Sequence, residues 1–188
     1  ARAPTASPTA AAAPALDMAR ELRPDLIGLQ ASNPQRYPGL ILSSGDTGWD
    51  VLFAFPQDAV RISAAEGLHD LQSHPAMRLR PVPQNECNLP FSGGWVCAFA
   101  YELGGLFEPS VGWVEDDTDF PLAWLMRIPA ATLFDRASGR SVLMAEAGQT
   151  GLLDRMQRDL AAALAPLPAV PELRAVQEDK PATFLAGV

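Results

Sequence analysis

A glycine pair that opens a strand of small and apolar residues constrains the fold of this chain more than any other feature. Residues 89–109 read LPFSGGWVCAFAYELGGLFEP, so Gly93 and Gly94 precede an apolar run that a second glycine pair closes. Glycine adopts backbone angles, and permits close approaches, that a Cβ would forbid. We therefore predict that residues 95–101 form a buried strand that another part of the chain approaches closely.

Hydrophobic patterns predict the remaining elements. Alternating runs between glycine, proline and aspartate indicate strands and hairpins, whereas apolar residues at every third or fourth position indicate helices. The connections between the strands are short enough for antiparallel pairing, which predicts an α+β fold with a mostly antiparallel, strongly bent sheet and helices on one face. The predicted elements are helices at 15–23 and 64–71, a hairpin over 40–55 with its turn at 45–48, strands at 59–63 and 120–128, a hairpin over 131–145, and a helix capped by Thr150 with the apolar face Leu152, Leu153, Met156, Leu160 and Leu164.

Length and composition predict one folded unit with two tails. The chain has 188 residues, of which 48% are hydrophobic, enough to bury the core of one domain of common size. Residues 1–14 contain mainly alanine, proline and threonine, and we expect a flexible arm. Residues 15–165 form the predicted domain, and the proline-rich residues 166–188 are interpreted as a linker.

Charge and cysteine usage exclude several classes of partner. The net charge of −8 and the lack of Lys and Arg clusters argue against nucleic acid and anionic membranes as partners. Cys87 and Cys97 have neither metal-ligand spacing nor the density of a secreted disulfide scaffold. The first residues lack the continuous apolar run of a signal peptide or membrane span. We therefore expect a cytoplasmic protein with reduced thiols.

The sequence provides no recognisable catalytic or metal-binding set. His69 and His74 flank Asp70 without a motif that would recruit them as a base or ligand. The acidic residues between 115 and 119 lack the spacing of a calcium loop, so a solvated loop is the favoured interpretation. Serine elbows and phosphate loops are also absent from the sequence. We expect no catalytic residue and no metal site in this chain.

The glycine-bounded strand resembles a segment in the N-terminal half of the chorismate-utilising synthases, which include the large subunits of anthranilate synthase and aminodeoxychorismate synthase. In that family the segment runs Pro-Phe-x-Gly-Gly-x-x-Gly-x-x-x-Tyr-Asp-Leu-Gly. Cys97 stands here at the usual third glycine, Glu102 replaces the aspartate, and Gly105 occupies a position where many members have arginine. The matching residues are Pro90, Phe91, Gly93, Gly94, Tyr101, Leu103 and Gly104.

A second segment, residues 36–45, is similar to the Leu-Leu-Glu-Ser strand of the same family, which helps to form a tryptophan pocket. Leu42 and Ser44 match, whereas Ser43 replaces the glutamate that can hold the ligand's ammonium group. The missing charge-assisted hydrogen bond is typically worth about 1.5–3 kcal/mol, which favours the aminodeoxychorismate branch over a feedback-inhibited anthranilate synthase. The resemblance implies a tryptophan-like pocket, with Phe91 and Trp95 as further aromatic neighbours, lined by Leu42, Ser43, Ser44, Trp49 and Tyr101.

The resemblance implies a scaffold domain without chemistry of its own. In the aminodeoxychorismate branch such a domain supports a C-terminal chorismate-binding domain, and a glutamine amidotransferase subunit supplies ammonia for making 4-amino-4-deoxychorismate, a precursor of p-aminobenzoate and folate. The Mg²⁺ would belong to the C-terminal half, so this chain alone is expected to be inactive. The alternatives are the anthranilate synthase branch, more distantly isochorismate or salicylate synthases, and a stand-alone small-molecule or protein-binding module. Edge strands left open predict a homodimer.

Overall fold

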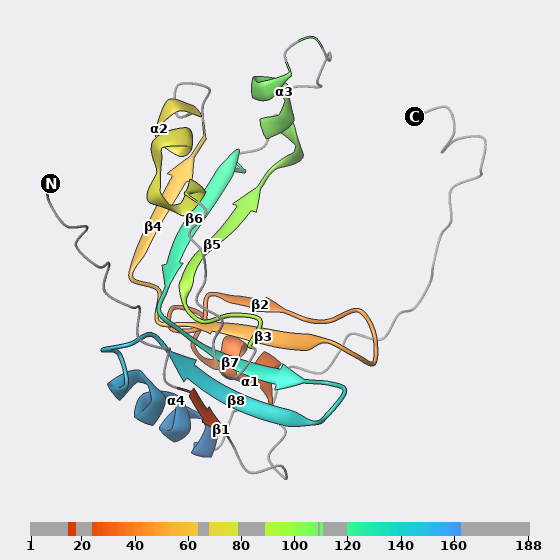
Figure 1. The fold of residues 1–188 in the computed structure, drawn as a ribbon, viewed down its shortest axis with the longest axis vertical. Helices are drawn as coiled ribbons and strands as arrows, with labels where there is room; N and C mark the ends of the chain where they lie inside the picture. Colours follow the sequence, from red (N-terminus) through yellow and green to blue (C-terminus); the bar gives the residue numbers. More distant parts are fainter. Residues whose placement is uncertain are drawn as a thin grey trace, which may run out of the picture.

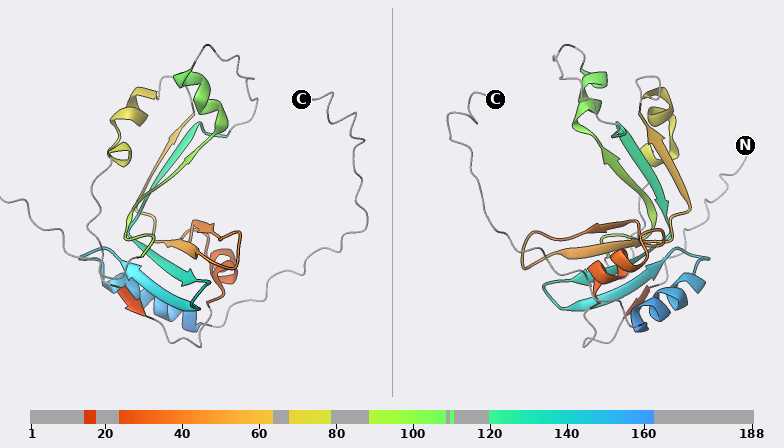
Figure 2. Two further views of the ribbon diagram at one scale, coloured as in Figure 1. Left: turned by 45° about the vertical axis from the view of Figure 1, so that its right-hand side comes forward. Right: turned by 180° about the vertical axis from the view of Figure 1, so that it is seen from behind.

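Two antiparallel sheets that meet at a steep angle organise the protein (Figure 1, Figure 2). The computed structural model of the chain describes residues 15–17, 24–63, 68–78, 89–108, 110 and 120–162. The five-stranded sheet has the order β1 (Ala15–Asp17), β8 (Arg140–Ala145), β7 (Ala130–Asp135), β3 (Trp49–Ala54) and β2 (Gly39–Ile41). The three-stranded sheet has the order β4 (Asp58–Ile62), β6 (Ala123–Ile128) and β5 (Gly94–Phe99).

Helices accompany both sheets, so the fold is α+β, as the sequence predicts. Every strand pair in the described residues is antiparallel. The predicted hairpins and strands are present, with ends that differ by a few residues. The prediction that residues 95–101 form a buried strand is wrong as to burial, because β5 is an edge strand in which every residue keeps some exposure, and Tyr101 lies beyond it in a 3₁₀ turn. The helical elements are α1 (Leu26–Ser32), α2 (Leu68–Ser73), the 3₁₀ turns η2 (Pro75–Met77) and η3 (Tyr101–Leu103), α3 (Gly104–Phe107) and α4 (Gly151–Ala161).

Strand continuity produces the corner between the sheets. β3 runs into β4 through residues 55–57, and β6 runs into β7 through the fully buried Pro129. Phe55 takes a φ of +59°, a left-handed conformation that turns the chain at this point. Two backbone hydrogen bonds join the segments across the bend, from Gln57 N–H to the Arg127 carbonyl (3.0 Å) and from Glu146 N–H to the Pro129 carbonyl (2.8 Å). The strongly bent sheet of the prediction is thus present as two sheets that share two bent strands.

The hydrophobic core is divided by the sheets into three clusters. On the outer face of the five-stranded sheet, α1 and α4 cover Leu52, Leu143 and neighbouring residues. Met156 of α4 is fully buried in this cluster. The outer face of the three-stranded sheet carries a second cluster with α2, the 3₁₀ turns and α3. The third cluster fills the inner corner, where Met126 and Ile128 meet side chains of β3, β7 and β8. The described helices therefore lie on the outer, convex face of both sheets.

Two local predictions at the N-terminal side are wrong. The predicted helix at 15–23 is a strand at Ala15–Asp17, because these residues pair with the free edge of β8; residues 18–23 lie outside the described part. Helix α1 has no counterpart among the predicted elements, because Pro24 in the sequence indicates only the end of a helix. Asp25 follows it and caps α1 by accepting a hydrogen bond from Gly28 N–H (2.8 Å).

Several predicted features fall outside the described residues. They are the arm at 1–14, residues 64–67 of the predicted helix at 64–71, Cys87, the acidic residues at 115–119, Leu164 and the linker at 166–188. The second half of the predicted helix at 64–71 is the start of α2.

Candidate functional site

The glycine pair stands at the corner between the sheets. Gly93 and Gly94 have φ angles of +97° and +133°, which confirms the prediction that this entry needs glycine. A Cβ on Gly93 would overlap the side chain of Glu146, whereas a Cβ on Gly94 would meet nothing within 4 Å. The close approach predicted from the sequence is therefore made at Gly93.

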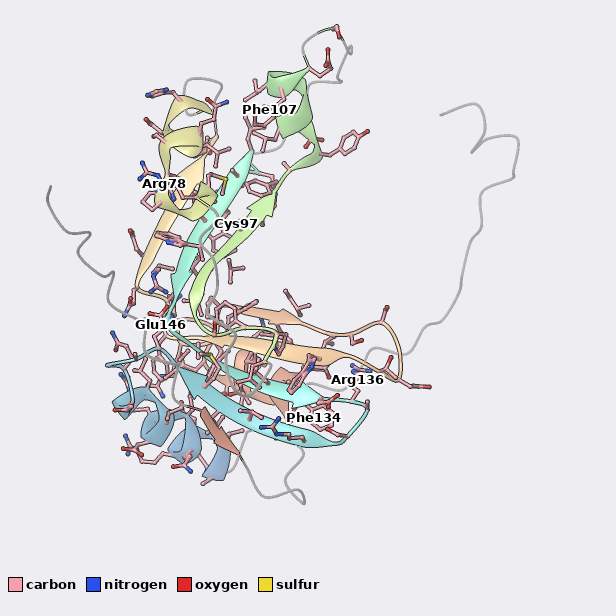
Figure 3. All side chains as sticks on the ribbon, viewed as in Figure 1. Arg78, Cys97, Phe107, Phe134, Arg136 and Glu146 are labelled. Carbon is pink, nitrogen blue, oxygen red and sulfur yellow. The ribbon has the colours of Figure 1, made fainter. Side chains whose placement is uncertain are left out.

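Glu146 lies at this corner (Figure 3). Arg127 forms an ion pair with it. The Arg127 Nη2 donates to both carboxylate oxygens of Glu146, at 2.7 and 2.5 Å. Its Nη1 donates to the carbonyls of Gly94 and Ile128, both at 3.0 Å. One guanidinium thus connects β5, β6 and the residue that follows β8, so the glycine pair lies at the joint between the sheets.

The hairpin residues of the expected tryptophan pocket lie near a buried carboxylate. Asp50 is 4% exposed, and it accepts hydrogen bonds from Ser43 N–H and Arg136 Nε, both at 2.8 Å. The Ser43 hydroxyl donates to the Thr47 carbonyl at 2.6 Å, which closes the β2–β3 loop. Leu42 is 47% exposed and lines a cavity beside this pair. Asp50 and Arg136 were not singled out from the sequence, where only their opposite charges could have indicated them.

That cavity has a volume of about 320 Å³ and mixed walls. Arg136 and Phe134 border it at the end of the five-stranded sheet (Figure 3). Apolar walls with a few polar groups are typical of sites for small amphipathic ligands. The lining comprises Pro24, Asp25, Leu26, Ile27, Leu42, Asp50, Phe134 and Arg136.

The aromatic residues of the expected pocket are divided between two faces. Trp49 and Phe91 contact the inner corner cluster, where the Phe91 ring meets Phe53 edge-on at 5.2 Å. Trp95 faces the opposite side of β5 and contacts His74, with ring centroids 4.6 Å apart. Tyr101 is 79% exposed, in η3 at the far end of the three-stranded sheet. The described structure therefore places Leu42 and Ser43 beside the buried Asp50, and Trp49 and Phe91 against the same core cluster, but it places Trp95 and Tyr101 elsewhere.

The other residues of the two motifs have structural positions. Ser44 lies in the β2–β3 loop and Pro90 in the exposed approach to β5. Glu102 lies in η3, and Gly104 begins α3. Gly104 also lines an apolar cavity of about 520 Å³ with Leu71, Met77, Phe99, Leu103 and Phe107.

His74 and Cys97 have structural surroundings and not those of reactive groups. The His74 Nδ1 accepts a hydrogen bond from Ala76 N–H at 3.1 Å and so caps η2. Cys97 is a free, half-buried thiol on β5, and burial raises its pKa. A raised pKa lowers the thiolate fraction that a nucleophile requires. These contacts account for both side chains as parts of the fold.

Within the part of the chain that the structure describes, one face of the three-stranded sheet is uncovered, a feature that sequence reasoning missed. Because side chains alternate along a strand, Trp124 on β6, Ala98 on β5 and Arg61 on β4 point to the inner side, opposite the helices. All three are exposed, Trp124 by 37%. Nearer the corner, Met126 on the same face is buried in the inner cluster. The alternation of side chains along a strand does not by itself predict which face of the sheet other elements cover.

Searches for other kinds of site and for relatives gave no match. Among the described residues, no group of three or more His, Cys, Asp or Glu side chains could hold a metal ion. None of the helices in this part of the chain has the length and apolar character needed to cross a membrane. Models of known protein families do not match the sequence, and curated proteins provide no match either.

Proposed function

We propose that this chain is the N-terminal, non-catalytic scaffold domain of a chorismate-utilising synthase, of the aminodeoxychorismate branch. Its role is to support a C-terminal chorismate-binding domain, which carries the Mg²⁺ and the chemistry, and to help dock the glutamine amidotransferase subunit that supplies ammonia. The protein acts in the cytoplasm. The proposal rests on two segments in the family's order, residues 36–45 and 89–109.

The observation that carries this proposal is the open inner face of the three-stranded sheet. An isolated sheet face with an exposed tryptophan is unusual for a domain that works alone, because exposed apolar surface marks an interaction site. The inner face is continuous with the buried corner cluster, so a partner seated there would extend an existing core. A second polypeptide half of the same enzyme is the occupant that fits a scaffold role.

Complementation in trans tests the scaffold function. The purified 188-residue chain is expected to give no product from chorismate, Mg²⁺ and ammonium. Added to a separately produced C-terminal chorismate-binding half of an aminodeoxychorismate synthase, it is expected to raise formation of 4-amino-4-deoxychorismate above that of the half alone. Product from the chain by itself, or no gain in the mixture, would contradict the proposal.

The product identifies the branch. Anthranilate, in place of 4-amino-4-deoxychorismate, would assign the chain to the alternative anthranilate synthase branch. Strong inhibition of the complete enzyme by tryptophan would point the same way, because feedback inhibition is the property of that branch. Ser43 lacks the carboxylate that holds an inhibitor's ammonium group, so we expect such inhibition to be absent.

A second candidate function is that of a small-molecule binding module, and the cavity beside Leu42 favours it. Its apolar walls could accept an indole, while Arg136 and Asp25 are placed for the charged groups of an amino acid. Calorimetric titration of the chain with tryptophan tests this function. Binding that Leu42→Asp abolishes would support it, and absence of heat at millimolar tryptophan would exclude it.

A further inference from the structure

A second cavity, of about 450 Å³, lies on the convex side of the corner and has no part in the proposed function. Three segments that are distant in the sequence meet there: the loop after α1, the bend between β3 and β4, and the start of α4. Its polar lining includes Asn33, Arg36, Gln57, Gln149 and Arg155, and Phe55 forms one wall.

One of the two arginines is already neutralised. The Arg36 Nη1 donates to both oxygens of Asp159, at 2.7 and 2.6 Å, and the Tyr37 hydroxyl donates to Asp159 Oδ2 at 2.7 Å. Burial alone would raise the pKa of Asp159, but these hydrogen bonds hold it below its ordinary value. Asp159 is therefore an ionised partner whose oxygens are occupied by Arg36 and Tyr37.

Arg155 is left as the cation of the cavity. Its guanidinium lies over the Phe55 ring, 4.5 Å from the ring centroid. Within the described part of the chain this side chain makes no hydrogen bond and no ion pair within 4 Å, although its charge acts on the nearby Asp159 carboxylate and helps to lower the pKa of Asp159. Contact with an aromatic ring uses the face of a guanidinium, whereas its N–H donors lie in the plane and point outward at the edges. The fork of Arg155 is thus available to a ligand.

We propose that this cavity binds a small organic acid with one carboxylate and a short apolar body. The planar fork of Arg155 matches a carboxylate, with the side-chain amides of Gln57 and Gln149 as further donors. Leu152 and Pro56 provide an apolar wall for the remainder of the ligand. Arg36, Asp159 and Arg155 together carry a net charge of +1, which suits a monoanion. A phosphate carries close to two negative charges at neutral pH, more than this net charge offsets, so the site disfavours it.

Titration of the full 188-residue chain with sodium benzoate, followed by amide NMR shifts, tests the proposal. Saturable shifts are expected at residues 33–36, 55–57 and 149–155. Arg155→Gln is expected to weaken binding about tenfold or more, the effect of losing a charge-assisted hydrogen bond pair. Arg158→Gln is the matched control, an exposed arginine one turn away that does not line the cavity. It is expected to bind within about twofold of the parent chain.

Further measurements distinguish binding of a carboxylate at this cavity from general binding of anions. Inorganic phosphate at equal ionic strength is expected to bind more weakly than benzoate, and tighter phosphate binding would overturn the carboxylate assignment. Equal benzoate affinity of the Arg155→Gln and Arg158→Gln variants would overturn the site itself. Arg155→Lys keeps the charge without the planar fork and should bind between the parent chain and Arg155→Gln, a comparison that also serves if the glutamine variant fails to fold. None of these results depends on complementation of a chorismate-binding half.

Discussion

At the residue scale, Gly93 is the position where sequence and fold constrain each other most. Its φ of +97° costs any residue with a Cβ about 1–3 kcal/mol, and the Cβ would also overlap Glu146. Gly93→Ala is therefore expected to lower the free energy of unfolding by more than this backbone cost alone. Urea unfolding followed by circular dichroism measures the change.

Gly148→Ala is the matched control for the Gly93 prediction. Gly148 has a φ of +86°, but a Cβ there would meet nothing within 4 Å, so only the backbone cost applies. In a Glu146→Ala background, the cost of Gly93→Ala should fall to the level of the Gly148 control, because the overlap is gone. An unchanged cost in that background would show that Glu146 plays no part in selecting glycine.

Tyr37 predicts how stability changes at alkaline pH. Its side chain is 1% exposed, and burial, together with the hydrogen bond to Asp159, raises the pKa of its phenol above the ordinary value of 10.0. The stabilisation is fully present below pH 10. Above it the unfolded chain loses the phenol proton while the folded chain keeps it, so the free energy of unfolding falls by up to about 1.4 kcal/mol per pH unit.

Comparison with Tyr37→Phe isolates this contribution. The variant loses the hydrogen bond to Asp159 and should be less stable at neutral pH by about 1.5–3 kcal/mol. The difference between the two proteins should then narrow as the pH rises above 10. Both are made in a Tyr101→Phe background, so that tyrosinate absorbance reports Tyr37 alone, since the chain has two tyrosines. A constant difference across pH 9–11 would contradict the prediction.

At the element scale, the two helix starts lead to opposite expectations. The Asp25 carboxylate accepts a hydrogen bond from Gly28 N–H, whereas the Thr150 side chain makes no capping hydrogen bond, contrary to the cap predicted from the sequence. Asp25→Ala is therefore expected to cost about 1 kcal/mol, and Thr150→Ala less than about 0.5 kcal/mol. Thermal unfolding of both variants measures this, and a larger loss at Thr150 would show that a cap forms there in solution.

Patterns that repeat along the chain made most elements predictable. β7 and β8 alternate between two buried faces around a turn at residues 136–139, and Gly139 supplies the φ of +70° in that turn. The predicted apolar face of α4 contacts the outer core cluster as far as Leu160. Such patterns are local, and therefore visible without knowledge of the partner element.

Features that depend on distant partners could not be predicted. β1 is a strand because β8 offers an edge more than 120 residues later, and its own residues give only a weak helical pattern. The bend at Phe55 requires positive φ at a residue that rarely adopts it. In the candidate site, the Asp50–Arg136 pair joins residues 86 positions apart. Nothing in either local sequence indicates that they meet.

At the scale of the whole molecule, the corner gives the protein a covered side and an open side. Helices lie on the convex face of both sheets (Figure 2). The inner face of the three-stranded sheet is exposed beyond Met126. The joint formed by Gly93, Arg127 and Glu146 fixes the angle at which that face is presented. A rigid corner suits a scaffold, because a partner that binds a preformed surface loses little free energy to ordering it.

The open face leads to a prediction about assembly. Trp124→Glu places a charge at the centre of that face and should weaken association with a C-terminal chorismate-binding half by about thirtyfold or more, the usual effect of losing a buried tryptophan anchor. Trp124 is 37% exposed, so the variant also loses part of its packing in the isolated chain, and circular dichroism at the assay temperature checks that it is folded. Phe107→Glu, at an exposed phenylalanine on α3, is the matched control and should bind like the parent chain.

Sedimentation velocity of each variant, with and without the C-terminal half, measures both kinds of assembly. The chain alone, at rising concentration, also tests the homodimer that open edge strands predict, and β4 and β5 are the edges of the three-stranded sheet. A dimer paired through a strand edge should survive Trp124→Glu, because backbone groups form it. A dimer lost in that variant would instead use the open face, in competition with the C-terminal half. If Trp124→Glu and the parent chain bind that half equally well, the docking surface lies elsewhere on the molecule.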